Sequence, residues 1–168
     1  MPDTKVRIET PSPNQILVHG LTVNYDHTPS EAVAGLPNNN SLIASSFPKE
    51  LWSGDKTGIV TDVTLPFWFP RQQFSTSDGR RMQGQIGYCL PAEIAALKDE
   101  EEARKTLRDM GIWALVALRQ SDEMLWRDPN GNLRPVYFCL GRYYLGFYLG
   151  YAFNDWHGDS ALGGAPQV

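Results

Sequence analysis

The chain has 168 residues, 42% of them hydrophobic and 20% charged, which is enough for one domain with a single sizeable core. Its formal net charge is −4, whereas nucleic-acid-binding domains usually carry a net basic face. The composition therefore predicts one soluble globular domain and makes a nucleic-acid partner unexpected.

The cysteines and the beginning of the chain bear on the compartment. Cys89 and Cys139 are far apart in the sequence, and the first fifteen residues lack the apolar core of a signal peptide. We therefore predict two free thiols in the reducing cytoplasm, although one disulfide between them stays open. Two cysteines and three scattered histidines do not have the spacing of a metal site, so we predict no metal and no cofactor.

The N-terminal third contains an arm, a strand and a short helix. Residues 1–14 hold three prolines and mostly polar side chains, which predicts a flexible arm or an extended lead-in. Residues 15–25 are rich in β-branched and apolar residues, which favours a strand. Thr28, Pro29 and Glu31 then form a capping box with proline at the first helical position. This helix must be short, because glycine, proline and three asparagines follow it.

The middle of the chain predicts a strand followed by helix. Residues 58–70 alternate between apolar and polar, which predicts a strand. Proline cannot donate to a ladder, so Pro66 implies that this strand lies at a sheet edge or pairs with its N–H side free. Residues 75–87 are compatible with a short, glycine-weakened helix. Residues 90–111 predict one long amphipathic helix, or two short helices with a break near 98–100.

The C-terminal third predicts strands. Residues 112–119 form a short apolar run typical of a buried strand, and residues 123–140 contain Asp-Pro-Asn-Gly between apolar flanks, which predicts a hairpin. Residues 142–154 alternate strictly, which predicts a long strand. Their length and Arg142 do not fit a membrane helix, which needs roughly 20 apolar residues.

Together these elements predict an α+β fold. We expect a mostly antiparallel sheet of about five to six strands, with one long helix or two short ones packed on one face. The single domain should span 15–157, and residues 158–168 should form a flexible tail or, equally, a docking peptide.

The predicted strand 142–154 raises the question of an interaction surface. One face carries large apolar residues such as Phe147, and the other alternates glycines with Tyr144 and Tyr148. Glycines on a strand face let another layer, a partner chain or a ligand approach closely, although they can equally serve twist or a bulge. Our first hypothesis is therefore a non-enzymatic protein that self-associates or docks a protein partner through this face.

Two further hypotheses remain open. A small-ligand module for a nucleotide or sugar would use Trp68, Tyr144, Tyr148 and Trp156, with His157 and Arg71 as further binding candidates. An enzyme would use Asp26 with His27, or the polar cluster at 154–159. No known catalytic motif is present in the sequence, so we assign no catalytic residue and lean toward a non-enzymatic role.

A series of short segments also carries a resemblance. They are Val-Asn-Tyr-Asp at 23–26, Glu-Ala at 31–32, "GYCLPAEIAAL" at 87–97, "IWALVALR" at 112–119 and "DPNGN" at 128–132. Their order resembles a group of small uncharacterised bacterial proteins. The resemblance implies an α+β domain from a bacterium or its phage. The group has no assigned activity, so the resemblance implies no catalytic residue.

Overall fold

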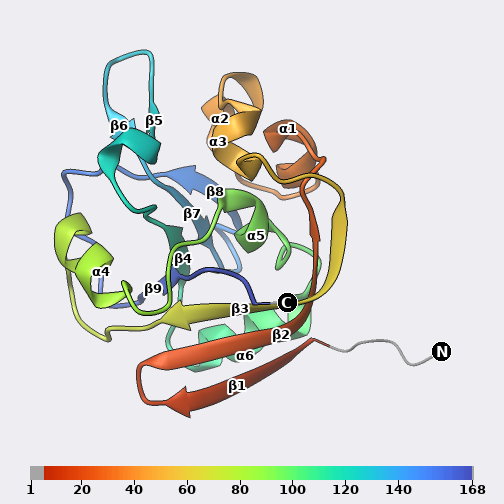
Figure 1. Cartoon of the computed structure of the whole chain (residues 1–168), viewed down its shortest axis with the longest axis vertical. Coiled ribbons are helices and arrows are strands. Elements are labelled where there is room, and N and C mark those ends of the chain that lie inside the picture. The colour runs from red at the N-terminus through yellow and green to blue at the C-terminus, as the bar shows by residue number, and fades with distance from the viewer. Residues whose placement is uncertain (1–5, 168) are drawn as a thin grey trace.

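The chain folds around a seven-stranded mixed sheet, which confirms the predicted α+β class (Figure 1). The computed structural model describes residues 6–167. The strand order is β1-β2-β3-β9-β4-β7-β8, and all neighbours are antiparallel except β9 and β4. The strands are β1 (Arg7–Ser12), β2 (Gln15–Asn24), β3 (Ile59–Trp68), β4 (Ala114–Ala117), β7 (Val136–Cys139), β8 (Gly146–Leu149) and β9 (Ser160–Gly163).

Short helices and one small hairpin surround this sheet. The helices are α1 (Pro29–Val33), α2 (Ser41–Ser45), α3 (Lys49–Ser53), α4 (Thr76–Met82), α5 (Pro91–Ala95), α6 (Glu101–Asp109) and the 3₁₀ turn η1 (Asp122–Met124). The hairpin consists of β5 (Trp126–Arg127) and β6 (Leu133–Arg134). The capping box of Thr28 and Glu31 begins α1, as predicted. The region 90–111 forms two short helices rather than one.

The two faces of the sheet are covered differently. On the packed face, Leu115 of β4 and Phe138 of β7 join the larger core, which also contains residues of α1, α2, α3, α5 and α6. On the second face, Val116 of β4 joins a smaller cluster with Phe74 and Trp156, against which Tyr137 of β7 packs. Successive residues of one strand point to opposite faces, so the same strands build both clusters.

Both predicted terminal extensions contribute strands, which corrects the domain boundaries. Residues 7–12 of the expected arm form the edge strand β1, and residues 160–163 of the expected tail form β9, between β3 and β4. All four residues of β9 are buried. A Cβ at Gly163 would lie 2.4 Å from Cys89 Sγ, so close packing at this point needs glycine. Residues 1–5 and 168 lie outside the described part of the chain.

The long aromatic strand predicted at 142–154 is wrong in its length, because only Gly146–Leu149 is a strand. The outer edge of β8 is covered by the chain itself. The backbone N–H groups of Asn38 and Asn40 donate to the carbonyls of Leu145 and Phe147 at 3.2 and 2.9 Å, respectively. The asparagine run between α1 and α2 therefore protects an edge that would otherwise be free to pair with another chain.

The glycines of this segment also meet the chain's own atoms. A Cβ at Gly146 would lie 1.2 Å from the carbonyl oxygen of Asn38, and one at Gly150 would lie 2.6 Å from the Trp156 ring. The close approach that these glycines permit is therefore intramolecular. The tyrosine–glycine face is not left open for a partner at either position.

Two smaller predictions also change. Strand β3 is an inner strand rather than an edge, because it lies between β2 and β9. The Pro66 carbonyl accepts from the Gly164 amide at 2.7 Å. β9 pairs with only Phe67 and Trp68 of β3, and Gln167 forms a separate bridge to Thr64. The predicted hairpin 123–140 is divided, because β5 and β6 pair with each other while β7 joins the main sheet. Within residues 6–167 no helix has the length and apolar character needed to cross a membrane.

Candidate functional site

A cavity of about 410 Å³ opens on the second face of the sheet. Its floor is formed by the central strands, and its wall is formed by the segment that follows β8. The floor residues are Ala114, Tyr137, Cys139 and Ser160. The other lining residues are Trp113, Leu149, Gly150, Tyr151, Asn154, Asp155, Trp156, His157 and Asp159.

Two of the aromatic rings are fixed by their neighbours. Tyr137 stacks on Tyr148 with ring centroids 5.5 Å apart and meets Trp156 edge-on at 5.8 Å. The Trp156 indole N–H donates to Thr76 Oγ1 of α4 at 3.0 Å. Burial raises the pKa of the Tyr137 hydroxyl, which therefore stays protonated and can donate a hydrogen bond. This side of the cavity is preformed.

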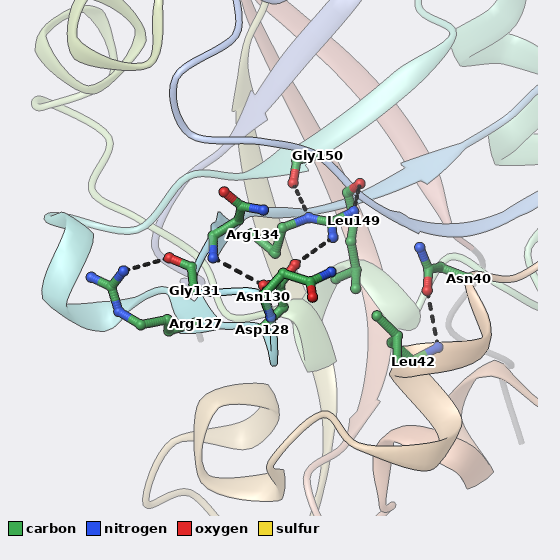
Figure 2. A network of polar contacts seen from close by, with 10 residues as sticks. Asn40, Leu42, Arg127, Asp128, Asn130, Gly131, Arg134, Leu149 and Gly150 are labelled. Atoms are coloured by element: carbon green, nitrogen blue, oxygen red, sulfur yellow. Dashed lines mark hydrogen bonds and ion pairs between the residues drawn. The ribbon is translucent and has the colours of Figure 1, made fainter.

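The segment that follows β8 is held by a buried ion pair (Figure 2). Arg134 of β6 donates through Nη1 to Asp128 Oδ2 at 2.8 Å. Its Nε and Nη2 donate to the carbonyls of Gly150 and Leu149 at 2.7 and 2.9 Å. The guanidinium carbon also lies 4.0 Å from the centre of the Tyr151 ring. One arginine thus ties the β5–β6 hairpin to the backbone and one ring of the cavity wall.

The turn of the hairpin completes this network. The other carboxylate oxygen of Asp128 accepts hydrogen bonds from the backbone N–H groups of Asn130 and Asn132, both at 2.9 Å. The hydrogen bond from Arg134, supported by these two amides, lowers the pKa of the Asp128 carboxyl. The Asp-Pro-Asn-Gly sequence that predicted a turn therefore also supplies the anion that holds Arg134.

Polar side chains line the part of the wall that follows Tyr151. They are Asn154, Asp155, His157 and Asp159. Asp155 Oδ2 accepts from the Gln73 amide at 3.1 Å. The half-buried Asp159 carboxylate has no hydrogen bond or ion pair to any of residues 6–167. In the same part of the chain, no three His, Cys, Asp or Glu side chains are grouped closely enough to hold a metal ion.

The structure brings three of the predicted binding candidates to this cavity. Trp156 and His157 line it, and Tyr148 supports it from behind through the stacked Tyr137 ring. Trp156 is buried, whereas His157 is exposed at the rim. The polar cluster at 154–159, which the enzyme hypothesis used, also lines the cavity.

The other candidates lie elsewhere. Trp68, at the end of β3, packs against the small cluster of the second face but does not line the cavity. Tyr144 is 68% exposed on the loop before β8. Arg71 stacks on the Phe69 ring at 4.6 Å and donates to the Pro13 carbonyl, beside the β1–β2 turn. The expected pocket of Trp68, Tyr144, Tyr148 and Trp156 is therefore not formed as a unit.

Asp26 and His27 are also separate from the cavity. Asp26 Oδ1 accepts the Gly58 amide at 2.9 Å and so joins the end of β2 to the start of β3. His27 borders a different hollow, next to Asp99 and Glu100. The carboxylate has a structural partner in the backbone, and no hydrogen bond joins it to the imidazole within the described residues.

Sequence reasoning missed several lining residues, among them Trp113, Tyr137, Cys139 and Tyr151. For two of them a signal existed. In Val136–Cys139 the buried Val136 and Phe138 alternate with Tyr137 and Cys139, so an apolar inner face implies that the other two point outward together. Cys139 is a free, partly exposed thiol, whereas Cys89 is free and fully buried, and burial raises the pKa of the Cys89 thiol.

Two segments behind the resemblance to small bacterial proteins meet away from the cavity. The Tyr25 hydroxyl donates to Glu93 Oε2 at 2.6 Å, and Lys56 Nζ lies 2.9 Å from the same oxygen. Glu93 Oε1 accepts the Leu90 amide at the start of α5. These contacts join the end of β2 to a helix and give the segments a structural role. No family model, no curated protein and no solved structure matches the chain.

Proposed function

We propose that this protein binds a small organic molecule in the cavity on the second face of the sheet. The observation that carries the proposal is the combination of a cavity of about 410 Å³ with four aromatic rings and a polar rim. Ligand sites typically have volumes of roughly 300–1,000 Å³, mostly apolar walls and a few polar groups that orient the ligand. The rings belong to Trp113, Tyr137, Tyr151 and Trp156.

The position of the cavity supports this function. Its floor rests on β4, β7 and β9, which lie in the interior of the sheet order. Its wall is fixed by the Arg134 hydrogen bonds and by the Trp156–Thr76 contact. A preformed site loses little conformational entropy when a ligand binds, so modest contacts suffice for useful affinity.

The chain contains a natural reporter for this site. Cys139 is partly exposed in the cavity floor, and Cys89 is buried elsewhere. We would expose the folded protein to iodoacetamide in the presence of panels of metabolites and quantify alkylation of each cysteine by peptide mass spectrometry. A ligand in the cavity should slow the alkylation of Cys139. Cys89 should stay unmodified throughout, because it is fully buried in the folded protein. Alkylation of Cys89 would therefore report unfolding.

Matched variants make this test specific. Trp113→Ala removes an aromatic wall, and a compound that protects Cys139 should lose that protection. Ile59→Ala is the control, because Ile59 is an exposed hydrophobic residue that does not line the cavity. If no compound in panels of sugars, nucleotides, amines, amino acids and carboxylic acids protects Cys139 at millimolar concentration, the proposed function is wrong.

A second candidate function is docking of a protein partner or self-association, which the loop before β8 favours. Tyr143 and Tyr144 are 80% and 68% exposed, and such side chains are enriched at interfaces. Size-exclusion chromatography with light scattering should then show a complex that Tyr144→Glu dissociates. If the wild-type protein and the Tyr144→Glu variant are both monomeric, self-association is excluded. The free thiols of Cys89 and Cys139 suit either function in the cytoplasm, where we propose that the protein resides.

A further inference from the structure

We infer that the cavity binds an organic cation with an alkylammonium head. This inference deepens the proposed function and rests on it. It follows from the charges and rings around the cavity, and from where the neighbouring cations are already engaged.

The cavity contains negative charge without a compensating cation. Asp155 and Asp159 both line it, and no lysine or arginine does. Neither carboxylate forms an ion pair within residues 6–167. The neutral Gln73 amide satisfies only one oxygen of Asp155. A half-buried carboxylate such as Asp159 is stabilised by an opposite charge, so an incoming cation gains more here than a neutral molecule does.

The arginine that holds the cavity wall is not available to bind an anion. Arg134 uses Nη1 for Asp128 and its other nitrogens for the carbonyls of Leu149 and Gly150. Its charge is balanced by Asp128, which is as deeply buried. A phosphate or carboxylate ligand would therefore meet Asp155 and Asp159 with no free guanidinium or ammonium among the lining residues. This arrangement disfavours nucleotides and other anions.

Like the carboxylates, the aromatic rings favour the binding of a cation. The face of an aromatic ring carries negative potential and attracts a cation within roughly 6 Å. The wall already shows this contact on one ring, because the Arg134 guanidinium lies 4.0 Å from the centre of Tyr151. Trp113, Tyr137 and Trp156 line the cavity as well, and tryptophan is the strongest partner in such contacts.

A pair of probes of equal shape separates charge from size. Choline and its neutral isostere 3,3-dimethylbutan-1-ol differ mainly in the quaternary nitrogen. We expect choline to bind about tenfold more tightly than the isostere, as measured by calorimetry and by protection of Cys139 from iodoacetamide. Added salt should weaken choline binding and leave the isostere unaffected, because salt screens charge–charge attraction.

Two variants locate the source of the discrimination. Asp159→Asn should reduce the preference for choline over the isostere several-fold while keeping the shape of the side chain. Asp62→Asn is the matched control: it removes the same unit charge at an exposed position that does not line the cavity, and asparagine tolerates its positive φ of 56°. Trp113→Ala should weaken the binding of both probes.

The outcomes distinguish this inference from the proposed function. Equal binding of choline and its isostere, or protection of Cys139 by sugars but not by amines, would overturn the cationic ligand and leave small-molecule binding intact. Absence of protection by every class of compound would overturn both. Preference for choline that is unchanged in Asp159→Asn would overturn the role of that carboxylate in selecting the cation.

Discussion

The two faces of the sheet make opposite use of the same strands. On the packed face, Phe138 of β7 and Phe147 of β8 stack with ring centroids 4.4 Å apart and are fully buried. On the second face, Tyr137 and Cys139 of the same β7 form part of the floor of a cavity. The difference lies in what covers each face: several helices cover the first, and α4 with one irregular segment covers the second.

This comparison shows how a small domain can combine a stable core with an open, cavity-bearing face. Every second residue of a central strand contributes to the larger core, and the intervening residues are free to vary in chemistry. The second face is held by fewer and more polar contacts, such as the Trp156–Thr76 and Arg134–Asp128 hydrogen bonds. Substitutions on the two faces should therefore differ in size and in kind.

The largest effect is expected on the packed face. Phe147→Ala should lower the free energy of unfolding by about 4 kcal/mol, because it removes a fully buried aromatic ring and leaves a cavity. Denaturant unfolding measures this change. Phe153→Ala, at a position that is 74% exposed, should change the stability by less than about 0.5 kcal/mol. Equal stability of the two variants would refute the division into a packed and an open region.

Next in size is the ion pair behind the cavity wall. Arg134→Met should cost about 3 kcal/mol, because it keeps the apolar stem but leaves the Asp128 carboxylate buried without its cation. It should also raise the alkylation rate of Cys139, since the wall loses its anchor at Gly150. Arg127→Met is the control in the same hairpin, at an exposed side chain. A variant at Arg134 with wild-type stability would contradict a structural role of this pair.

A smaller loss is expected where the chain covers its own edge strand. Gly146→Ala should cost about 2 kcal/mol, because the new methyl group displaces the Asn38 backbone from β8. Thermal unfolding measures the loss, and light scattering tests whether the uncovered edge promotes association. In Gly84→Ala the new Cβ meets only ordinary contacts at 3.5 Å, so this variant should be close to wild type. The reverse order of stabilities would rule out this edge contact.

The smallest effect is a pH dependence. The folded-state pKa of Asp128 is lowered, so its contribution to stability is present above the ordinary carboxyl range and is lost as pH falls from about 4 toward the lowered value. Thermal melts between neutral pH and acid should show this loss. Asp128→Asn should flatten part of the acid slope, and the rest should persist because Glu31, hydrogen-bonded at the α1 cap, is shifted in the same direction. An unchanged slope would exclude Asp128 as a source.

The elements with local signals could be predicted from the sequence. The capping box of α1, the alternation of β3 and the turn of the β5–β6 hairpin depend on neighbouring residues, and all three are present in the structure. Strand β9 has no such signal. Its four residues, Ser160–Gly163, are too few for a periodic pattern, and their place between β3 and β4 depends on pairing with distant segments.

The candidate site was predictable only in part, for a related reason. Trp156 and His157 lie in an aromatic and polar run, which indicates a binding segment, and both line the cavity. The partners that complete the cavity, Trp113 and Tyr137, come from other strands and loops, so no spacing in the sequence brings them together. The glycines misled the prediction, because sequence does not tell whether Gly150 faces a partner or, as here, the chain's own Trp156.

The central position of β9 has a consequence for how the molecule is made. Strands β1, β2 and β3 precede it on one side of the sheet, and β4, β7 and β8 precede it on the other. When the nascent chain has emerged from the ribosome as far as β8, both halves of the sheet (β1–β3 and β4, β7 and β8) have been synthesised, but β9, which joins them, has not yet emerged. The two halves then expose unpaired edges at β3 and β4 until Ser160–Gly163 arrives. Chaperones should recognise nascent chains at that stage, because their sheet edges are unpaired. We expect the last step of folding to be the insertion of β9 between β3 and β4.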